Sequence, residues 1–372
     1  MKGYDRGIIA ATLLLCLFGV IMVFSASSIY ALKEYGTKYY FVRKQVLYLV
    51  MGIMAGSVVA VTDINLVRRH MKAVFGLALF LMALVFVPHI GVVVSGSHRW
   101  IRIGHFSMQP SEFAKPVLIL FIADLIDRKV RKGSDAVPVL GPLVYTVVLL
   151  FLMIREPDFG SAAITAGVIF AILFLSGADM GSLVATGLLG IGVGVVLVVH
   201  SAYRFNRIKA FLNPWQHAHT GAFQIVQSAI AYGAGGLTGV GLGNSFEKLF
   251  YLPEAHTDFI FSVIAEELGF LGVAAVIGVF IFLITKAFAV AARAESIFTK
   301  TAVYGLALLI AMQVIINISV TLGLLPTKGL TIPFISYGGS SLVAQLTSIG
   351  IILNLSKKVS EGGDEADYSR WG

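Results

Sequence analysis

Residues 137–200 read VPVLGPLVYTVVLLFLMIREPDFGSAAITAGVIFAILFLSGADMGSLVATGLLGIGVGVVLVVH, and this stretch decides the fold class. It contains three apolar runs, at 137–154, 159–176 and 180–200, with only short polar breaks between them. A helix needs about 20 apolar residues to cross the roughly 30 Å hydrocarbon core of a bilayer, and each run has about that length. The stretch therefore predicts three consecutive membrane-spanning helices joined by short loops.

The same pattern extends over the rest of the chain. Of its 372 residues, 57% are hydrophobic and 13% are charged, which is more apolar surface than a water-soluble core can absorb. Further apolar runs occur at 8–28, 45–62, 73–94, 112–127, 259–290, 302–325 and 336–356. We therefore expect an all-α polytopic membrane protein with about ten transmembrane helices, which form a single domain over residues 1–358.

Two of the runs, 259–290 and 8–28, have features beyond their length and hydropathy. The run 259–290 is long and carries Glu266 and Glu267, so part of it should lie outside the hydrocarbon or face protein. The first run lacks a small-residue cleavage site after it, so we expect it to remain a span rather than a cleaved signal peptide. Cys16 is the single cysteine, which excludes a disulfide framework or a cysteine metal cluster within one chain.

The distribution of lysine and arginine predicts the orientation. The net charge is +8, but these residues are scattered among short loops rather than gathered in one basic stripe, so we expect no nucleic-acid partner. With the N-terminus in the cytoplasm, fifteen of them lie on that side and twelve on the other, four of which are in a long loop. We expect both termini to be cytoplasmic and residues 359–372 to form a disordered tail.

Residues 201–257 are the long loop, between the seventh and eighth expected spans and on the outer face. Loops of this length are usually functional or disordered, and aromatic residues argue against disorder here. These residues are Tyr203, Phe205, Phe211, Trp215, Phe223, Phe246, Phe250 and Tyr251. We expect short helices on the membrane surface, with shorter polar insertions at 95–112, 155–159 and 326–337 reaching the same face.

Residues 251–261 read YLPEAHTDFIF, which places Glu254, His256 and Asp258 where an apolar helix begins. One interpretation is structural, with Thr257 or Asp258 capping the first free N–H groups of that helix. The other is chemical, because a partly desolvated carboxylate at the membrane boundary can act as a general base toward a hydroxyl group. Desolvation and the helix dipole shift its pKa in opposite directions, so both interpretations stay open.

Residues 97–116 read SHRWIRIGHFSMQPSEFAKP and form a second constellation. Glu112 and Lys115 are three residues apart on one helical face, where they form either a structural ion pair or part of a polar cavity. Arg99 and Arg102 are either ordinary interfacial side chains or partners for a pyrophosphate, which the planar guanidinium group suits.

Two glycine-rich runs are more ambiguous. Residues 233–243 read GAGGLTGVGLG, but no strand precedes them, so a dinucleotide site is not expected. These glycines either permit close approach to a lipid headgroup or supply turns. Residues 323–341 read GLLPTKGLTIPFISYGGSS, with Lys328 as the only charge, and predict a rigid outer loop.

Taken together, the runs 109–115, 253–259 and 326–341 closely resemble signatures of the SEDS family (shape, elongation, division and sporulation), over nearly the whole chain. The sequence of residues 327–330, TKGL, is more similar to the cell-division, FtsW-like branch than to the RodA-like elongation branch. The resemblance implies an inner-membrane peptidoglycan glycosyltransferase that polymerises lipid II. It also implies partners: a class B penicillin-binding protein that cross-links the product, and other divisome membrane proteins.

The resemblance also assigns roles. Asp258 matches the family's essential loop aspartate, and Glu112 with Lys115 matches its buried charge pair. Asp258 is then expected to deprotonate the acceptor GlcNAc 4-hydroxyl, which attacks the MurNAc pyrophosphate donor with inversion and releases undecaprenyl pyrophosphate. Candidates for stabilising the leaving charge are Arg99, Arg102 and Lys328; His256 is a supporting residue, and Mg²⁺ or Mn²⁺ is a candidate cofactor.

Two other functions are compatible with the sequence. A lipid II flippase would need a polar path, for which Glu112, Lys115, Glu266 and Glu267 are candidates. A non-catalytic scaffold would only position the penicillin-binding protein.

Overall fold

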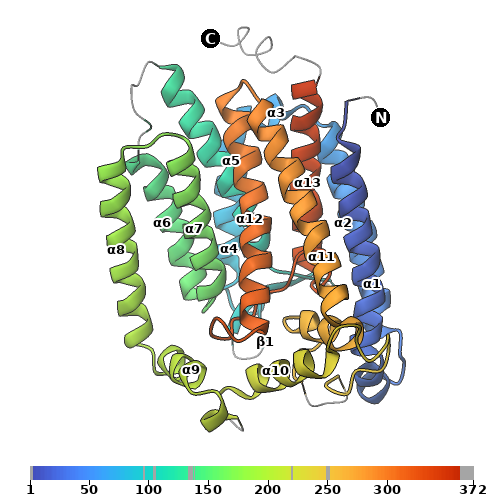
Figure 1. Cartoon of the computed structure of the whole chain (residues 1–372). Helices are drawn as coiled ribbons and strands as arrows, with labels where there is room; N and C mark the ends of the chain where they lie inside the picture. The colour runs from blue at the N-terminus through green and yellow to red at the C-terminus, as the bar shows by residue number, and fades with distance from the viewer. Residues whose placement is uncertain are drawn as a thin grey trace.

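The computed structural model describes residues 3–94, 97–103, 106–132, 137, 139–218, 221–248 and 252–360. Long helices run side by side as a bundle, with the strands and the short helices of residues 202–235 at one end (Figure 1). In chain order the elements are α1 (Arg6–Tyr35), α2 (Tyr40–Val61), α3 (Ile64–Arg69), α4 (Met71–Leu84), β1 (Gly91–Val94), β2 (Ser97–Ile103), β3 (Phe106–Met108), α5 (Pro110–Arg131), α6 (Leu140–Arg155), α7 (Phe159–Leu175), α8 (Met180–Val199), α9 (Ala202–Leu212), η1 (Trp215–His217), α10 (Phe223–Gly235), α11 (Ile260–Arg293), α12 (Ile297–Thr321) and α13 (Gly339–Ser360).

Each expected span corresponds to one of the longer helices. Helices α1, α2, α8, α11, α12 and α13 are long and apolar enough to cross a membrane, and α4, α6 and α7 are shorter apolar helices. Helix α5 has 22 residues and carries charged residues near both ends. The prediction of an all-α polytopic membrane protein with about ten transmembrane helices is confirmed.

The expected span at 73–94 is too long, because its helix ends at Leu84. Pro88 has no N–H group to donate within a helix, and the β-branched residues that follow favour extended backbone. The chain forms a small antiparallel sheet in the order β1-β2-β3, in which Val92 pairs with Trp100 and Arg102 pairs with Ser107. This sheet is an addition to the predicted all-α fold.

The two ends of the bundle differ. The described ends of the chain meet at one end, where the Ser360 hydroxyl donates to Gly3 O at 3.0 Å. Helices α9 and α10 and the sheet lie at the opposite end (Figure 1). Short helices in the long loop are therefore confirmed; Phe250, Tyr251 and residues 361–372 lie outside the described residues.

Helix α11 is interrupted at Gly269, whose φ of 64° and ψ of −165° suit glycine. The break separates a first part, residues 260–268, from a longer second part. Glu266 and Glu267 lie at the end of the first part and are buried against protein, as their sequence position predicted. The start of α11 lies at the end of the bundle that carries α9, α10 and the sheet (Figure 1).

Candidate functional site

The site is built on a tight turn that leads into α11. Glu254 adopts a left-handed conformation with φ 57°, and its carbonyl accepts hydrogen bonds from the N–H groups of Thr257 and Phe259. The segment before α13 binds this turn from the side: Tyr337 N donates to His256 O at 2.9 Å, and Ser336 Oγ donates to Thr257 O at 2.7 Å. Two segments that are far apart in the sequence are thus joined.

The Asp258 side chain is partly exposed and is held from two directions. Its carboxylate lies against the backbone of Gly329, where a Cβ atom would stand 3.2 Å from Asp258 Oδ2. Asn317 on α12 donates through Nδ2 to Asp258 O at 2.9 Å and to Leu330 O at 2.6 Å. Helix α12 therefore fixes the backbone on both sides of the carboxylate.

The charge state of Asp258 is unusual. Burial raises the pKa of its carboxyl to about 7, and the nearby Glu254 and Asp158 carboxylates also raise it, whereas Arg207 and Arg99 lower it. A carboxyl with such a pKa is poised between its acidic and basic forms near neutral pH, which suits a general base.

The capping interpretation of this segment is not observed. Helix α11 begins at Ile260, with Phe259 in the N-cap position and no side-chain cap hydrogen bond. Thr257 Oγ1 instead donates to the Glu254 carboxylate at 2.7 Å. Within the described part of the chain, no hydrogen bond reaches the Asp258 carboxylate, so its oxygens are available to a ligand.

Two cationic side chains, Arg207 and Arg99, lie close enough to lower the pKa of this carboxyl, and Lys328 belongs to the segment that contacts it. Arg99 on β2 donates to Glu156 O at 3.0 Å and to Pro157 O at 2.7 Å, which fixes its guanidinium group. Arg207 on α9 donates to Thr327 O at 2.9 Å. Lys328 directly precedes the glycine that contacts Asp258, and burial lowers the pKa of its ammonium group. Arg99 and Lys328 were among the candidates from the sequence, whereas Arg207 was not.

Two acidic residues beside Arg99 were missed. Glu156 is fully buried, and neither of its carboxyl oxygens has a hydrogen-bond partner among the described residues. Burial raises the pKa of Glu156 to about 8, Asp158 adds to the shift, and Arg99 opposes it. Asp158 is also buried and caps α7 by accepting from Ser161 N at 3.1 Å. From sequence alone, the run 155–158 indicates only a polar break between two spans.

Glu112 and Lys115 form the expected ion pair, with Nζ and Oε1 2.7 Å apart and the two side chains buried near the start of α5. The charges that shift the pKa of Asp258 do not come from this pair. Arg102 is exposed, on the face of β2 opposite Arg99, because successive side chains of a strand alternate. The structure therefore does not bring Arg102 together with Asp258.

His256 lies in an aromatic cluster rather than beside the carboxylate of Asp258. Its ring is 4.4 Å from that of Phe41, 5.7 Å from that of Tyr337 and 5.8 Å from that of Tyr30, measured between centroids. Burial lowers the pKa of His256, although Glu254 opposes the shift. A neutral ring anchors the turn against α1 and α2, which agrees with a supporting role.

The glycine-rich run 233–243 packs against the break in α11 and hydrogen-bonds to its backbone, rather than forming a phosphate cradle. A Cβ atom on Gly239, whose φ is 81°, would lie 2.2 Å from Glu267 O, so only glycine permits this approach. The run supplies partners for backbone groups that the break would leave unpaired. The hydrogen bonds are Val240 N to Glu266 O, Gly241 N to Glu267 O, Phe270 N to Gly236 O and Leu271 N to Leu237 O.

Buried side chains strengthen this support. Lys248 Nζ is 2.7 Å from Glu267 Oε1, and Ser25 on α1 donates to the same carboxylate at 2.6 Å. Glu266 accepts a hydrogen bond from Ser245 Oγ and another, at 2.8 Å, from Phe246 N. The first part of α11, which begins two residues after Asp258, is thereby attached to α1 and to residues 245–248, which follow the glycine-rich run.

A divalent cation, the candidate cofactor, has no ready-made site here. The described residues contain no group of three or more His, Cys, Asp or Glu side chains arranged to hold a metal ion.

The chain is similar to known proteins over nearly its full length. The model of the family described as cell cycle protein, which covers FtsW, RodA and SpoVE, matches residues 6–361. A relative from Trichlorobacter lovleyi, named probable peptidoglycan glycosyltransferase FtsW, is 44% identical over 95% of this chain and 93% of the relative.

Two solved structures have the same fold. A chain of a peptidoglycan synthase complex, in a study of polymerization and crosslinking, has a TM-score of 0.79 at 25% identity, covering 96% of this chain and 99% of that one. The rod shape determining protein RodA of Thermus thermophilus has a TM-score of 0.72 at 26% identity, covering 96% and 98% of the two chains.

Proposed function

The chain belongs to the cell cycle protein family of FtsW, RodA and SpoVE, which is the SEDS family. We propose that it is a peptidoglycan glycosyltransferase that polymerises lipid II. The name of the FtsW relative favours septal synthesis during cell division over elongation. One observation carries the catalytic proposal: Asp258 is partly exposed, lies next to Arg99 and Arg207, and has a pKa near neutrality.

In the proposed reaction Asp258 is the general base. It accepts the proton of the acceptor GlcNAc 4-hydroxyl as that oxygen attacks C1 of the donor MurNAc. The bond from C1 to the pyrophosphate oxygen breaks, undecaprenyl pyrophosphate leaves, and the configuration at C1 inverts. The proton on Asp258 then passes to solvent, which restores the base for the next addition.

The departing pyrophosphate carries negative charge that fixed cations stabilise. Arg99 is suited to this role because backbone carbonyls hold its guanidinium group in place. Arg207 and Lys328 are the further candidates from the two outer segments beside Asp258. Arg102 is exposed on the other side of β2, where it is a candidate for an early contact with donor phosphate rather than for the reacting centre.

The position of the site agrees with a lipid-linked donor. We propose that both termini and residues 359–372 are cytoplasmic and that Asp258 lies on the outer face of the bacterial inner membrane. A donor whose lipid tail stays in the bilayer then presents its sugars to the segments that surround Asp258. We also propose a class B penicillin-binding protein and other divisome membrane proteins as partners, for which the similar synthase-complex chain gives support.

A flippase needs polar groups that are free to line a path. Glu112 is paired with Lys115, Glu267 is paired with Lys248, and Glu266 is bound by Ser245 and Phe246 N. Because these charges are bound within the protein, they favour structural roles, whereas the Asp258 carboxylate is partly exposed. A pure scaffold has no use for that carboxylate and its cations.

The test is polymerisation of purified lipid II by the detergent-solubilised chain, with and without a class B penicillin-binding protein. Asp258→Asn should lower the rate by about 10²-fold or more, the usual contribution of a general base. Asp179→Asn is the matched control, since Asp179 only caps α8 and asparagine caps equally well. Wild-type rates in Asp258→Asn would exclude the proposed base, and glycan chains made in detergent cannot arise from flipping.

A further inference from the structure

A second candidate site lies at the other end of the bundle. A cavity of about 280 Å³ opens between the end of α5, the turn after α7 and the start of α12. This is the end of the bundle at which the described chain ends meet, opposite the end that carries α9, α10 and the start of α11 (Figure 1). No residue of the proposed active site lines the cavity.

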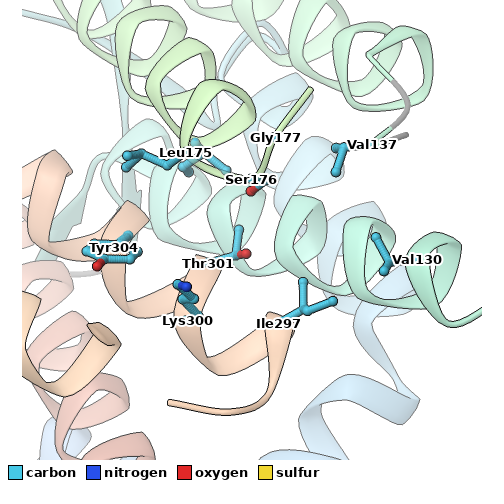
Figure 2. Close-up of a pocket in the computed structure, with 10 residues that line it drawn as sticks. Val130, Val137, Leu175, Ser176, Gly177, Ile297, Lys300, Thr301 and Tyr304 are labelled. Carbon is cyan, nitrogen blue, oxygen red and sulfur yellow. The ribbon is translucent and has the colours of Figure 1, made fainter. Parts of the chain in front are cut away.

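Four polar side chains face this cavity. Figure 2 shows Ser176 and Thr301 pointing toward each other, with Lys300 and Tyr304 beside them on α12. Within the part of the chain that the structure describes, the polar atoms of these four side chains form no hydrogen bond or ion pair. Thr301 is only 5% exposed and lines the cavity, so a ligand in the cavity can accept a hydrogen bond from its free hydroxyl.

The charge of the lining indicates an anion. Among the described residues that line the cavity, Lys300 is the only charged one. The cavity also lies at the N-terminal end of α12, where the helix dipole favours negative charge. The acidic residues of α5, Asp124 and Asp127, are already bound by arginines and do not oppose an anion.

The volume of the cavity and its apolar walls limit which anions can fit. The cavity is at the small end of the range for ligand pockets, which is about 300–1,000 Å³, so it suits a headgroup and not a sugar nucleotide. Apolar side chains such as Val130, Ile172 and Leu175 complete the lining. Leu175 is exposed on the outside of the bundle, so an acyl chain can continue from the cavity along the lipid-facing surface.

We propose that this cavity binds the phosphate of an anionic phospholipid from the leaflet at the end of the bundle where the termini lie. Lys300 donates to the phosphate as its cationic partner, and Thr301 and Ser176 donate through their hydroxyl groups. Free phosphate offers the same chemistry without an acyl chain. The proposal does not depend on the glycosyltransferase activity.

The test is native mass spectrometry of the delipidated full chain, titrated with phosphatidylglycerol, with phosphatidylcholine and with inorganic phosphate. Phosphatidylglycerol should bind more tightly than phosphatidylcholine. Thr301→Val and Lys300→Gln should each weaken that binding about tenfold or more, as expected for the loss of a hydrogen bond to a charged group. Lys72→Gln, which changes an exposed lysine on α4, is the matched control and should not weaken binding.

The outcomes are distinct. Preferential lipid binding that both cavity variants weaken supports the proposal. Binding of inorganic phosphate that depends on Thr301, without a lipid preference, assigns the cavity to a free phosphate and overturns the lipid assignment. Equal binding of both lipids with no phosphate binding, or phosphatidylglycerol binding that Thr301→Val leaves unchanged, overturns the site. Thr301→Val nearly preserves side-chain shape, and its unfolding temperature verifies that the variant is folded.

Discussion

The pH dependence of polymerisation provides the most specific test of Asp258 as base. With a pKa of about 7, roughly half of this carboxyl is ionised at pH 7 and roughly one-tenth at pH 6. Only the ionised form accepts a proton, so kcat/KM should fall about tenfold per pH unit below pH 7 and level off above pH 8. An aspartate at its ordinary pKa of 3.8 would give a flat profile over this range.

Two substitutions should move this profile in opposite directions. Glu254→Gln removes a negative charge that raises the pKa of Asp258, so the midpoint should shift to lower pH. Arg207→Gln removes a positive charge that lowers the same pKa, so the midpoint should shift to higher pH. The assay is the initial rate of lipid II polymerisation between pH 5.5 and 9, with Asp179→Asn as control. Shifts in the same direction, or a flat wild-type profile, would refute the reasoning.

Thermal unfolding distinguishes this effect from a loss of structure. Because the fold raises the pKa of Asp258, its contribution to stability is complete below the unfolded-state value near 3.8 and is lost as pH rises through about 7. At pH 8 the Asp258→Asn variant should therefore unfold at the same temperature as wild type or a higher one. A lower unfolding temperature would attribute its inactivity to damage of the fold.

Three further changes test the framework around the site. Lys248→Met leaves the Glu267 charge buried without its partner and should destabilise the chain by about 3–5 kcal/mol. In a double-mutant cycle measured by thermal unfolding, adding Glu267→Gln should restore most of this loss. Additive losses would contradict a direct ion pair. Gly239→Ala should lower the unfolding temperature, because its φ is positive and a Cβ atom meets backbone, while Gly190→Ala in open space on α8 should not. Asn317→Ala should lower kcat more than it raises KM for lipid II, since it frees the backbone of the turn; an effect on KM alone would contradict this role.

Several residues of the site were predictable from sequence. Asp258 follows a polar turn and precedes an apolar helix. A carboxylate at such a boundary costs free energy unless it has a functional role or is paired with a cation. Glu112 and Lys115 were predictable as a pair because residues three apart share a helical face. Arg99 and Lys328 stood out as isolated cations in outer insertions.

Other members of the site depend on contacts that no local pattern reveals. Arg207 reaches Thr327 across 120 residues of sequence, and Glu156 is buried beside Arg99 although it occupies a short break between spans. The first strand, Gly91–Val94, was hidden because a run of valines beside a helix is apolar in either conformation. The glycine-rich run likewise acquires its role only when the break in α11 lies against it.

The sequence by itself determined that this chain is a bundle of membrane-spanning helices, because the cost of placing polar groups in hydrocarbon makes hydropathy a strong constraint. It also made Asp258 a candidate for the site, because a carboxylate directly before an apolar helix is visible in the sequence alone. The tertiary structure alone decided which cations surround that carboxylate, why its pKa rises, and which side chains line the cavity at the opposite end. Those properties depend on the distances between segments far apart in the chain and on how deeply their side chains are buried. Local sequence predicts neither quantity.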